Sequence, residues 1–185
     1  MQKENNNIDE SKKELRLEIR NRKKVFTSEQ RILQSAELVK KIEAHPQFIQ
    51  SKLIMAYWAM KDEVDLTELI LKWHPEKQFL LPCVKGDELE IRRYEGLDSL
   101  QSGEAFGILE PVGNLFSQYE AIELILVPGV AFDNHNNRMG RGKAYYDKFL
   151  PKTKAFKMGI CFNFQMVNSI PTSKFDIKMD EVLSF

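Results

Sequence analysis

The stretch that decides the fold reads Val127-Pro128-Gly129-Val130-Ala131-Phe132-Asp133 and, after a short polar turn, Asn137-Arg138-Met139-Gly140-Arg141-Gly142-Lys143-Ala144-Tyr145-Tyr146-Asp147. An apolar run at 124–127 leads into it, and its end begins a predicted helix over 144–150. Glycines let a backbone approach a ligand closely, and free N–H groups at the start of a helix attract anions. A glycine-rich surface turn is the simpler interpretation. The order of strand, loop and helix, with three cations in the loop, favours a phosphate-binding loop.

This loop differs from the common nucleotide-binding motifs. Gly140 and Gly142 have one residue between them, where a P-loop has four. Ala144 follows Lys143, where a P-loop has a serine or threonine whose hydroxyl holds magnesium. No GxGxxG pattern follows a predicted strand either. The sequence therefore predicts an anion site without the usual signature, and any metal must be held by a carboxylate.

The composition indicates one soluble globular domain spanning residues 1–185. Hydrophobic residues make up 43% of the chain and charged residues 29%, which are ordinary values for such a domain. No apolar run approaches the roughly 20 residues that span a bilayer, so we expect no membrane partner. Residues 1–10 are polar and rich in asparagine. We expect them to be flexible and not to form a signal peptide.

Charge and cysteine content limit the classes of partner. The chain has 27 basic and 27 acidic residues and a formal net charge of zero, so no overall field attracts nucleic acid. Cys83 and Cys161 lie in apolar runs and lack metal-ligand spacing, which indicates reduced core residues. These features predict a cytoplasmic protein in which any polyanion site is a local cluster of cations.

Hydrophobic periodicity and turn residues predict alternating helices and strands. The predicted helices are 11–25, opened by a capping box of Ser11 and Glu14; 27–42, opened by Thr27 and Gln30 and ended by His45-Pro46; 65–73, capped by Asp65; and 144–150. The predicted strands are 53–58; 79–84, with Pro82 near its end; 88–94 at an edge; 124–127 in the centre; 158–162; and 182–183. Residues 96–119 lack a sustained period and are predicted to form a long excursion over the sheet.

This alternation predicts an α/β fold, a three-layer sandwich around a mostly parallel, Rossmann-like sheet. In such sheets ligands bind beyond the carboxyl ends of the strands. The loop 128–143 and the segment 60–63 each follow a predicted buried strand. We therefore expect these two segments to face one cleft.

Taken together, the motifs resemble the 5-formyltetrahydrofolate cyclo-ligase family, also called methenyltetrahydrofolate synthetases. The resemblance spans nearly the whole chain. It rests on Lys12-x-x-Leu15-Arg16, on Met60-Lys61-Asp62-Glu63-Val64-Asp65, on the two stretches quoted first, and on 175–183. One position departs from the family, which usually has a third glycine where this chain has Ala144. Because alanine tolerates helical dihedral angles well, we expect helical geometry there.

The resemblance implies an enzyme of one-carbon metabolism, an ATP- and Mg²⁺-dependent carbon–nitrogen ligase. The implied reaction closes 5-formyltetrahydrofolate to 5,10-methenyltetrahydrofolate and releases ADP and phosphate through a phosphorylated formyl intermediate. Such a transfer depends on positioning and charge neutralisation. The implied partners are the folate and MgATP. We expect a monomer that binds neither nucleic acid nor a membrane.

The resemblance also implies a role for each matching residue. The catalytic residues are Lys143, Arg141 and Tyr145. The ATP-binding residues are Lys12 and Arg16, four apart on one helix face, with Arg138, Met139, Gly140, Arg141, Gly142, Lys143, Ala144, Tyr145 and Tyr146. The folate-binding residues are Trp58, Glu63, Arg141, Gly142, Lys143, Ala144 and Tyr145. The metal ligands are Asp147 and Asp176.

Each assignment has a structural alternative. Cations on the first helix can form a solvated basic face, Glu63 can be an exposed loop acid, and Trp58 can be a core residue. Asp147 and Asp176 can be a helix-terminal charge and a turn cap. His45, His74 and His135 are interpreted as cap and turn residues without a catalytic role.

Two other functions compete with the ligase. A folate- or nucleotide-binding homologue without turnover would retain the same binding residues, and ADP release that depends on the folate separates it from an enzyme. An RNA-binding module would need basic and aromatic residues gathered on one face. The zero net charge and the absence of RNA-binding motifs argue against that class.

Overall fold

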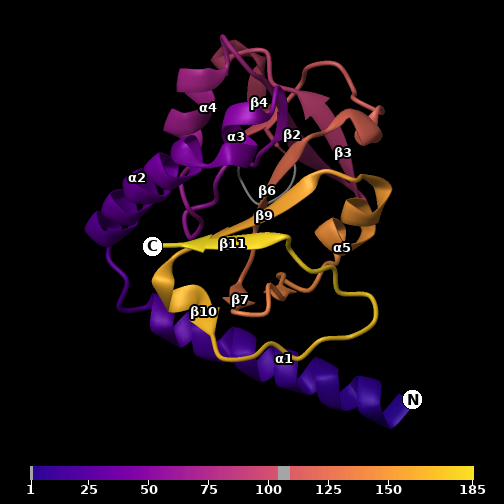
Figure 1. Ribbon diagram of the computed structural model, residues 1–185. Coiled ribbons are helices and arrows are strands. Elements are labelled where there is room, and N and C mark those ends of the chain that lie inside the picture. Colours follow the sequence, from indigo (N-terminus) through magenta and orange to yellow (C-terminus); the bar gives the residue numbers. More distant parts are fainter. Residues whose placement is uncertain (1, 104–108) are drawn as a thin grey trace.

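A six-stranded, mostly parallel sheet forms the centre of the molecule, in the order β11-β9-β6-β1-β2-β3 (Figure 1). The computed structural model describes residues 2–103 and 109–185, with side chains from residue 7. The strands are β1 (Leu53–Met55), β2 (Gln78–Lys85), β3 (Glu88–Arg93), β6 (Leu124–Pro128), β9 (Phe156–Cys161) and β11 (Glu181–Ser184). Among these six, β3 alone runs antiparallel, at one edge. The predicted α/β fold with a central β6 is confirmed.

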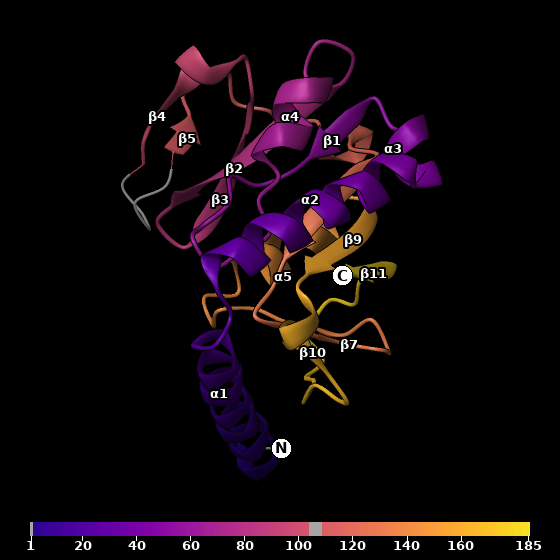
Figure 2. The same cartoon turned by 90° about the vertical axis from the view of Figure 1, so that its left-hand side faces the viewer.

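Helices cover both faces of this sheet. The described helices are α1 (Gln2–Lys23), which lies apart from these faces, and α2 (Ser28–Ala44), α3 (Pro46–Gln50), α4 (Thr67–Trp73) and α5 (Tyr145–Phe149). Figure 2 shows α2 and α4 in front of the strands and α5 behind them. Successive strand residues point to opposite faces, so Ile54 packs in the cluster under α2 and α4, while Met55 packs in the cluster under α5. The three layers follow from this alternation.

Two smaller sheets complete the fold. The strands β7 (Ala131–Asp133), β8 (Arg138–Met139) and β10 (Met166–Val167) form one of them. The predicted loop 128–143 is therefore largely a β-hairpin. The strands β4 (Leu100–Ser102) and β5 (Leu109–Pro111) form the other, in the segment predicted to be irregular. Residues 104–108 of that segment lie outside the described residues.

The first helix differs most from its prediction. It begins at Gln2, so Ser11 lies inside the helix and does not cap it, and residues 2–10 are helical. The helix runs along the base of the molecule (Figure 1). Buried Ile19 packs with residues of β7 and β8. Tertiary packing of this kind stabilises a helix whose few apolar positions made its start hard to predict.

Local turn chemistry was predicted more accurately. Thr27 and Gln30 form the expected capping box, with Gln30 N donating to Thr27 Oγ1 at 3.2 Å and Thr27 N donating to Gln30 Oε1 at 2.9 Å. The predicted strand 79–84 is β2, which extends one residue further at each end, and Pro82 lies three residues before its last residue, Lys85. β1 pairs with β2 only as far as Leu80, so no neighbour on that side requires the amide that Pro82 lacks.

One aromatic contact joins the small sheet to the central sheet. Phe132 of β7 is fully buried. A Cβ atom added to Gly159 of β9 would lie 2.5 Å from the Phe132 ring, and one added to Gly129 would lie 2.6 Å from it. The ring therefore requires glycine on both neighbouring segments.

We predict that Gly159→Ala lowers the free energy of unfolding by about 1–3 kcal/mol, the usual cost of overpacking a dense core. Denaturant titration measures the change. Combining it with Phe132→Leu, and comparing with Phe132→Leu alone, tests the cause. If the alanine costs as much beside leucine as beside phenylalanine, the Phe132 contact is not responsible.

Candidate active site

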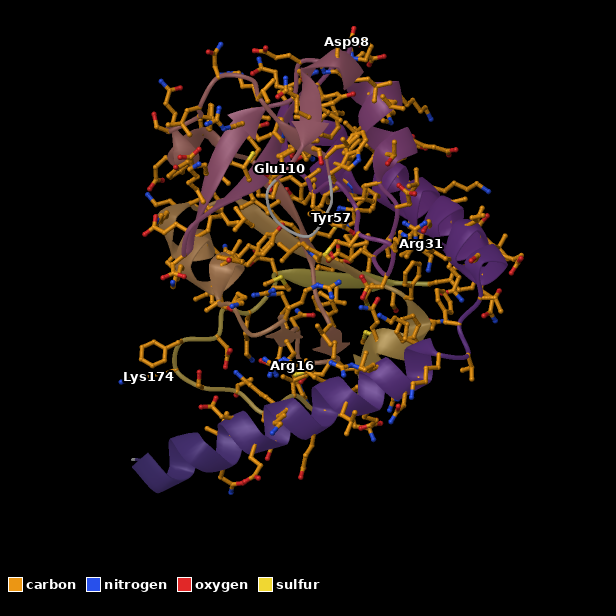
Figure 3. All side chains as sticks on the ribbon, turned by 180° about the vertical axis from the view of Figure 1, so that it is seen from behind. Arg16, Arg31, Tyr57, Asp98, Glu110 and Lys174 are labelled. Carbon is orange, nitrogen blue, oxygen red and sulfur yellow. The ribbon has the colours of Figure 1, made fainter. Side chains whose placement is uncertain are left out.

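A cavity of about 240 Å³ lies beyond the carboxyl ends of β6 and β1. The segment 60–63 lines one side of it, and residues from Pro128 to Lys143 line the other. The predicted single cleft is therefore confirmed. Figure 3 shows Tyr57, two residues after β1, in the middle of the molecule, with Glu110 above it and Arg16 of α1 below.

The structure brings most of the predicted site residues to this cavity. Those lining it are Trp58, Glu63, Arg138, Gly140, Arg141, Lys143, Ala144, Tyr145, Tyr146 and Asp147. Those outside its lining are Lys12, Arg16, Met139, Gly142 and Asp176. The side chain of Met139 is buried in the small core beside Ile19. Met139 could therefore offer a ligand only its backbone.

One wall of the cavity is apolar and was not predicted. Pro82, Val84 and Leu89, from β2 and β3, line it. Trp58 lies at the cavity too and stacks on Tyr94, with ring centroids 6.1 Å apart and an interplanar angle of 29°. Such a wall suits a flat heterocycle. Sequence periodicity identified these residues as strand residues, but it carries no signal about which surface they share.

Glu63 provides the buried carboxylate of the cavity. Its side chain is 11% exposed, and its Oε2 accepts a hydrogen bond of 3.0 Å from Met60 N. Oε1 lies 3.2 Å from an Arg141 guanidinium nitrogen. Burial raises the pKa of Glu63, opposed by the Met60 amide and by Arg141. Glu63 is therefore not the exposed loop acid of the alternative interpretation.

Arg138 and Asp147 form a buried ion pair that the sequence did not reveal. A guanidinium nitrogen of Arg138 lies 2.9 Å from Asp147 Oδ1, and the two side chains are 3% and 17% exposed. Arg138 also donates to Pro128 O at 3.3 Å and lies over the Tyr146 ring. The sequence assigned Arg138 to ATP and Asp147 to a metal, whereas the structure pairs them with each other.

Lys12 and Asp176 form a second pair. Lys12 Nζ lies 2.6 Å from each carboxylate oxygen. Although burial opposes it, the bond from Lys12 lowers the pKa of Asp176, and the Ser173 amide contributes. One helical turn further on, Arg16 Nε donates to Gly140 O at 3.0 Å. The two cations face the body of the protein, so the solvated basic face is not the correct interpretation for them.

The predicted metal ligands are thus each paired with a cation. Asp147 lines the cavity, and Asp176 does not. Within residues 2–103 and 109–185, no group of three or more His, Cys, Asp or Glu side chains is arranged to hold a metal ion. Only Oδ1 of Asp147 has a hydrogen-bond partner in that part of the chain. Asp147 therefore keeps one oxygen available.

A second, smaller cavity of about 140 Å³ adjoins the first. Arg141 and Gly129 line both cavities. Asp62 lines the smaller one, where it accepts from Arg141 at 2.7 Å and from Lys23 of α1 at 2.9 Å. Sequence reasoning assigned no role to Asp62 or Lys23. The position of Asp62 beside Glu63 was the one available signal.

Ala144 corrects a specific prediction. Its φ of 55° and ψ of 18° lie in the left-handed region, whereas helical geometry was expected. The residue precedes α5, and its carbonyl accepts a hydrogen bond of 2.9 Å from Lys148 N. With Gly142 at φ 98°, it turns the chain from the loop into the helix. A conformation that suits glycine is therefore imposed on an alanine.

Comparisons with known proteins agree on one family. The model of the 5-formyltetrahydrofolate cyclo-ligase family matches residues 8–184. The 5-formyltetrahydrofolate cyclo-ligase of Mus musculus is 31% identical over 95% of this chain and 94% of its own length. The probable 5-formyltetrahydrofolate cyclo-ligase of Caenorhabditis elegans is 30% identical over 95% and 93%.

A solved structure is similar as well. The 5,10-methenyltetrahydrofolate synthetase of Aquifex aeolicus, determined by NMR, superposes with a TM-score of 0.83. It is 36% identical to this chain, and the superposition covers 94% of this chain and 89% of that one.

In the described part of this chain, no helix has the length and apolar character required to cross a bilayer.

We predict that Ala144→Gly raises the free energy of unfolding by about 0.5–1 kcal/mol. Relief of a left-handed alanine, roughly 1–2 kcal/mol, exceeds the entropy cost of glycine. Thermal or denaturant unfolding measures it. Ala36→Gly, inside α2, is the matched control and should cost about 1 kcal/mol. Destabilisation by both substitutions would show that the left-handed geometry carries no strain.

Proposed function

The chain belongs to the 5-formyltetrahydrofolate cyclo-ligase family, and we propose that it closes 5-formyltetrahydrofolate to 5,10-methenyltetrahydrofolate with the consumption of ATP. The family expected from the sequence motifs is thereby confirmed. The proposed site rests on one observation: Glu63, Arg141 and the exposed Lys143 all line one cavity that has an apolar wall. This cavity offers a buried acceptor for the folate and cations for a phosphate.

The folate would lie along the apolar wall, with its pterin ring at Glu63. The pterin has N–H donors that a carboxylate can accept, and one Glu63 oxygen is already fixed by Met60 N. Trp58 and Tyr57 line the same cavity. Tyr57 is held by its hydroxyl, which donates to Val64 O at 3.1 Å. The arrangement of Glu63, Trp58 and Tyr57 supports binding of a flat ring with N–H donors on one edge.

The nucleotide would place its γ-phosphoryl group between residues 138–143, here called the glycine loop, and the folate. The formyl oxygen attacks phosphorus as the bond to ADP breaks. N10 of the folate then attacks the formyl carbon, loses its proton, and phosphate departs with the former formyl oxygen. Lys143, Arg141 and Tyr145 line the cavity where charge would develop. Fixed cations at this position stabilise the transition state, in which the charge develops, more than they stabilise the ground state.

The other nucleotide-binding residues have supporting roles in this proposal. Arg16 contacts the glycine loop through Gly140 O, so Lys12 and Arg16 could meet phosphates from the side of α1. Arg138 is bound to Asp147 and buried. We assign Arg138 to holding the loop and not to direct contact with a phosphate.

Magnesium fits this proposal at Asp147 better than at Asp176. Mg²⁺ keeps several waters and needs only one or two carboxylates besides phosphate oxygens. Asp147 lines the cavity and keeps one oxygen available, whereas both oxygens of Asp176 are bound by Lys12. Bound Mg²⁺ would neutralise charge on the phosphates. We also propose that the protein is a cytoplasmic monomer that binds neither nucleic acid nor a membrane.

The test of the function is the ultraviolet absorbance of the methenyl product. It should form only when ATP, Mg²⁺ and 5-formyltetrahydrofolate are all present, together with stoichiometric ADP. Binding of both substrates without ADP release would identify a non-catalytic homologue. Salt-dependent binding of an oligonucleotide, without folate binding, would identify an RNA-binding module.

We predict that Glu63→Gln weakens binding of 5-formyltetrahydrofolate about ten-fold or more and leaves the affinity for ATP nearly unchanged. The amide accepts at one end only, and an unmet buried hydrogen bond costs about 1–3 kcal/mol. Separate titrations with each substrate measure this. Equal losses for both would mean that Glu63 supports the fold.

The same residue sets a pH dependence. Because burial raises the pKa of Glu63, the carboxylate takes up a proton at a higher pH than an exposed glutamate does. Folate affinity should fall as the pH is lowered through that range. In Glu63→Gln this dependence should disappear.

We predict that Lys143→Ala lowers kcat by roughly 100- to 1,000-fold, the typical effect of removing one preorganised group that stabilises transition-state charge. The KM for ATP should change much less. Lys148→Ala is the matched control, since Lys148 is exposed on α5 and donates to Asp87 O outside the cavity. An unchanged kcat with a raised KM for ATP would reduce Lys143 to a ground-state anchor.

A further inference from the structure

Three segments distant in the sequence meet at the carboxylate of Asp62. Its Oδ1 lies 2.7 Å from an Arg141 nitrogen in the glycine loop, and its Oδ2 lies 2.9 Å from Lys23 Nζ at the end of α1. Although burial opposes it, the bonds from Arg141 and Lys23 lower the pKa of Asp62. Asp62 is therefore an ionised, partly buried carboxylate between two cations.

Arg141 is the group that this carboxylate holds most directly. The same Arg141 nitrogen, Nη2, lies 2.7 Å from Asp62 and 3.2 Å from Glu63. A guanidinium has five N–H donors in a fixed fork. Among the described residues, Nε and Nη1 of Arg141 have no hydrogen-bond partner. Two carboxylates thus fix one corner of the guanidinium and leave the other donors for a ligand.

The two carboxylates face different spaces. Glu63 lines the larger cavity, Asp62 lines the smaller one, and Arg141 lines both. The two bonds differ as well, since the contact with Asp62 is the shorter by 0.5 Å (2.7 Å against 3.2 Å). If Asp62 lost its charge, Arg141 would be drawn onto Glu63 alone. The guanidinium would then move, and the acceptor oxygens of Glu63 would be occupied.

We propose that Asp62 is a positioning residue, which holds the Arg141 guanidinium between the two cavities and keeps it from pairing fully with Glu63. This inference rests on the proposed function, since its effect is exerted through the phosphate contact of Arg141 and the pterin contact of Glu63. Asp62 itself touches neither substrate. Its charge sets the orientation of one substrate-binding group and the availability of the other.

The central test is Asp62→Asn. The amide keeps the size of the side chain but loses the charge that competes with Glu63. We expect kcat to fall about ten-fold or more and the KM for 5-formyltetrahydrofolate to rise several-fold. Asp62→Glu, which restores the carboxylate, should recover part of both losses, and it decides the question if Asp62→Asn does not fold.

A double-mutant cycle identifies the route of the effect. In an Arg141→Ala background, Asp62→Asn should change kcat less than two-fold, because the group that it positions is gone. Lys23→Met breaks the other contact of Asp62 and should have a much smaller effect than Asp62→Asn. If Lys23→Met reproduces the loss, the tie to α1 matters and the positioning of Arg141 does not.

Asp65→Asn is the matched control. Asp65 lies in the same segment and pairs with Arg31 at 3.4 Å, and Arg31 lines neither cavity. The kcat of the Asp65→Asn variant should stay at the wild-type value. With an active wild type, an unaffected Asp62→Asn variant or additive losses in the cycle would overturn the inference alone. A wild-type protein without turnover would instead overturn the proposed function, and this inference with it.

Discussion

The buried contact between Arg138 and Asp147 holds together the three pieces from which the site is built. Arg138 belongs to β8, Asp147 belongs to α5, and the Arg138 guanidinium also donates to Pro128 O at the end of β6. A charge that is 3% exposed must be paired, because leaving one partner alone in such a place costs about 3–5 kcal/mol. The strand, the hairpin and the helix are therefore fixed relative to one another.

The cations of the glycine loop differ in how deeply they are buried and in how many carboxylates they contact. Arg138 is enclosed by its own protein partners, so it shapes the loop. Lys143 is exposed at the cavity and no ion pair holds it within the described residues, and Arg141 lies between these extremes, with two carboxylates at one corner. Side chains with the same positive charge therefore have different roles, depending on how far carboxylates of the protein already neutralise that charge. The cations that remain available are those that a phosphate could recruit without breaking the fold.

The helix α1 brings distant residues to the same place. Lys12, Arg16 and Lys23 contact Asp176, Gly140 O and Asp62, respectively. These contacts join the start of the chain to the closing segment, the glycine loop and the loop after β1. Because the partners are scattered through the sequence, the base of the site closes only when the whole chain is folded.

The sequence by itself determined the features that depend on neighbours along the chain. Alternating periodicity predicted the parallel sheet, Thr27 and Gln30 predicted a helix start that the structure contains, and strand ends placed 60–63 and 128–143 at one cleft. Only the tertiary structure decided the left-handed Ala144, the start of α1, and the pairs Arg138–Asp147, Lys12–Asp176 and Asp62–Arg141. Propensity and periodicity act over a few residues, whereas Lys12 and Asp176 are 164 positions apart. Which charges neutralise each other, and which stay available, depends on burial and distance that arise only when the chain has packed.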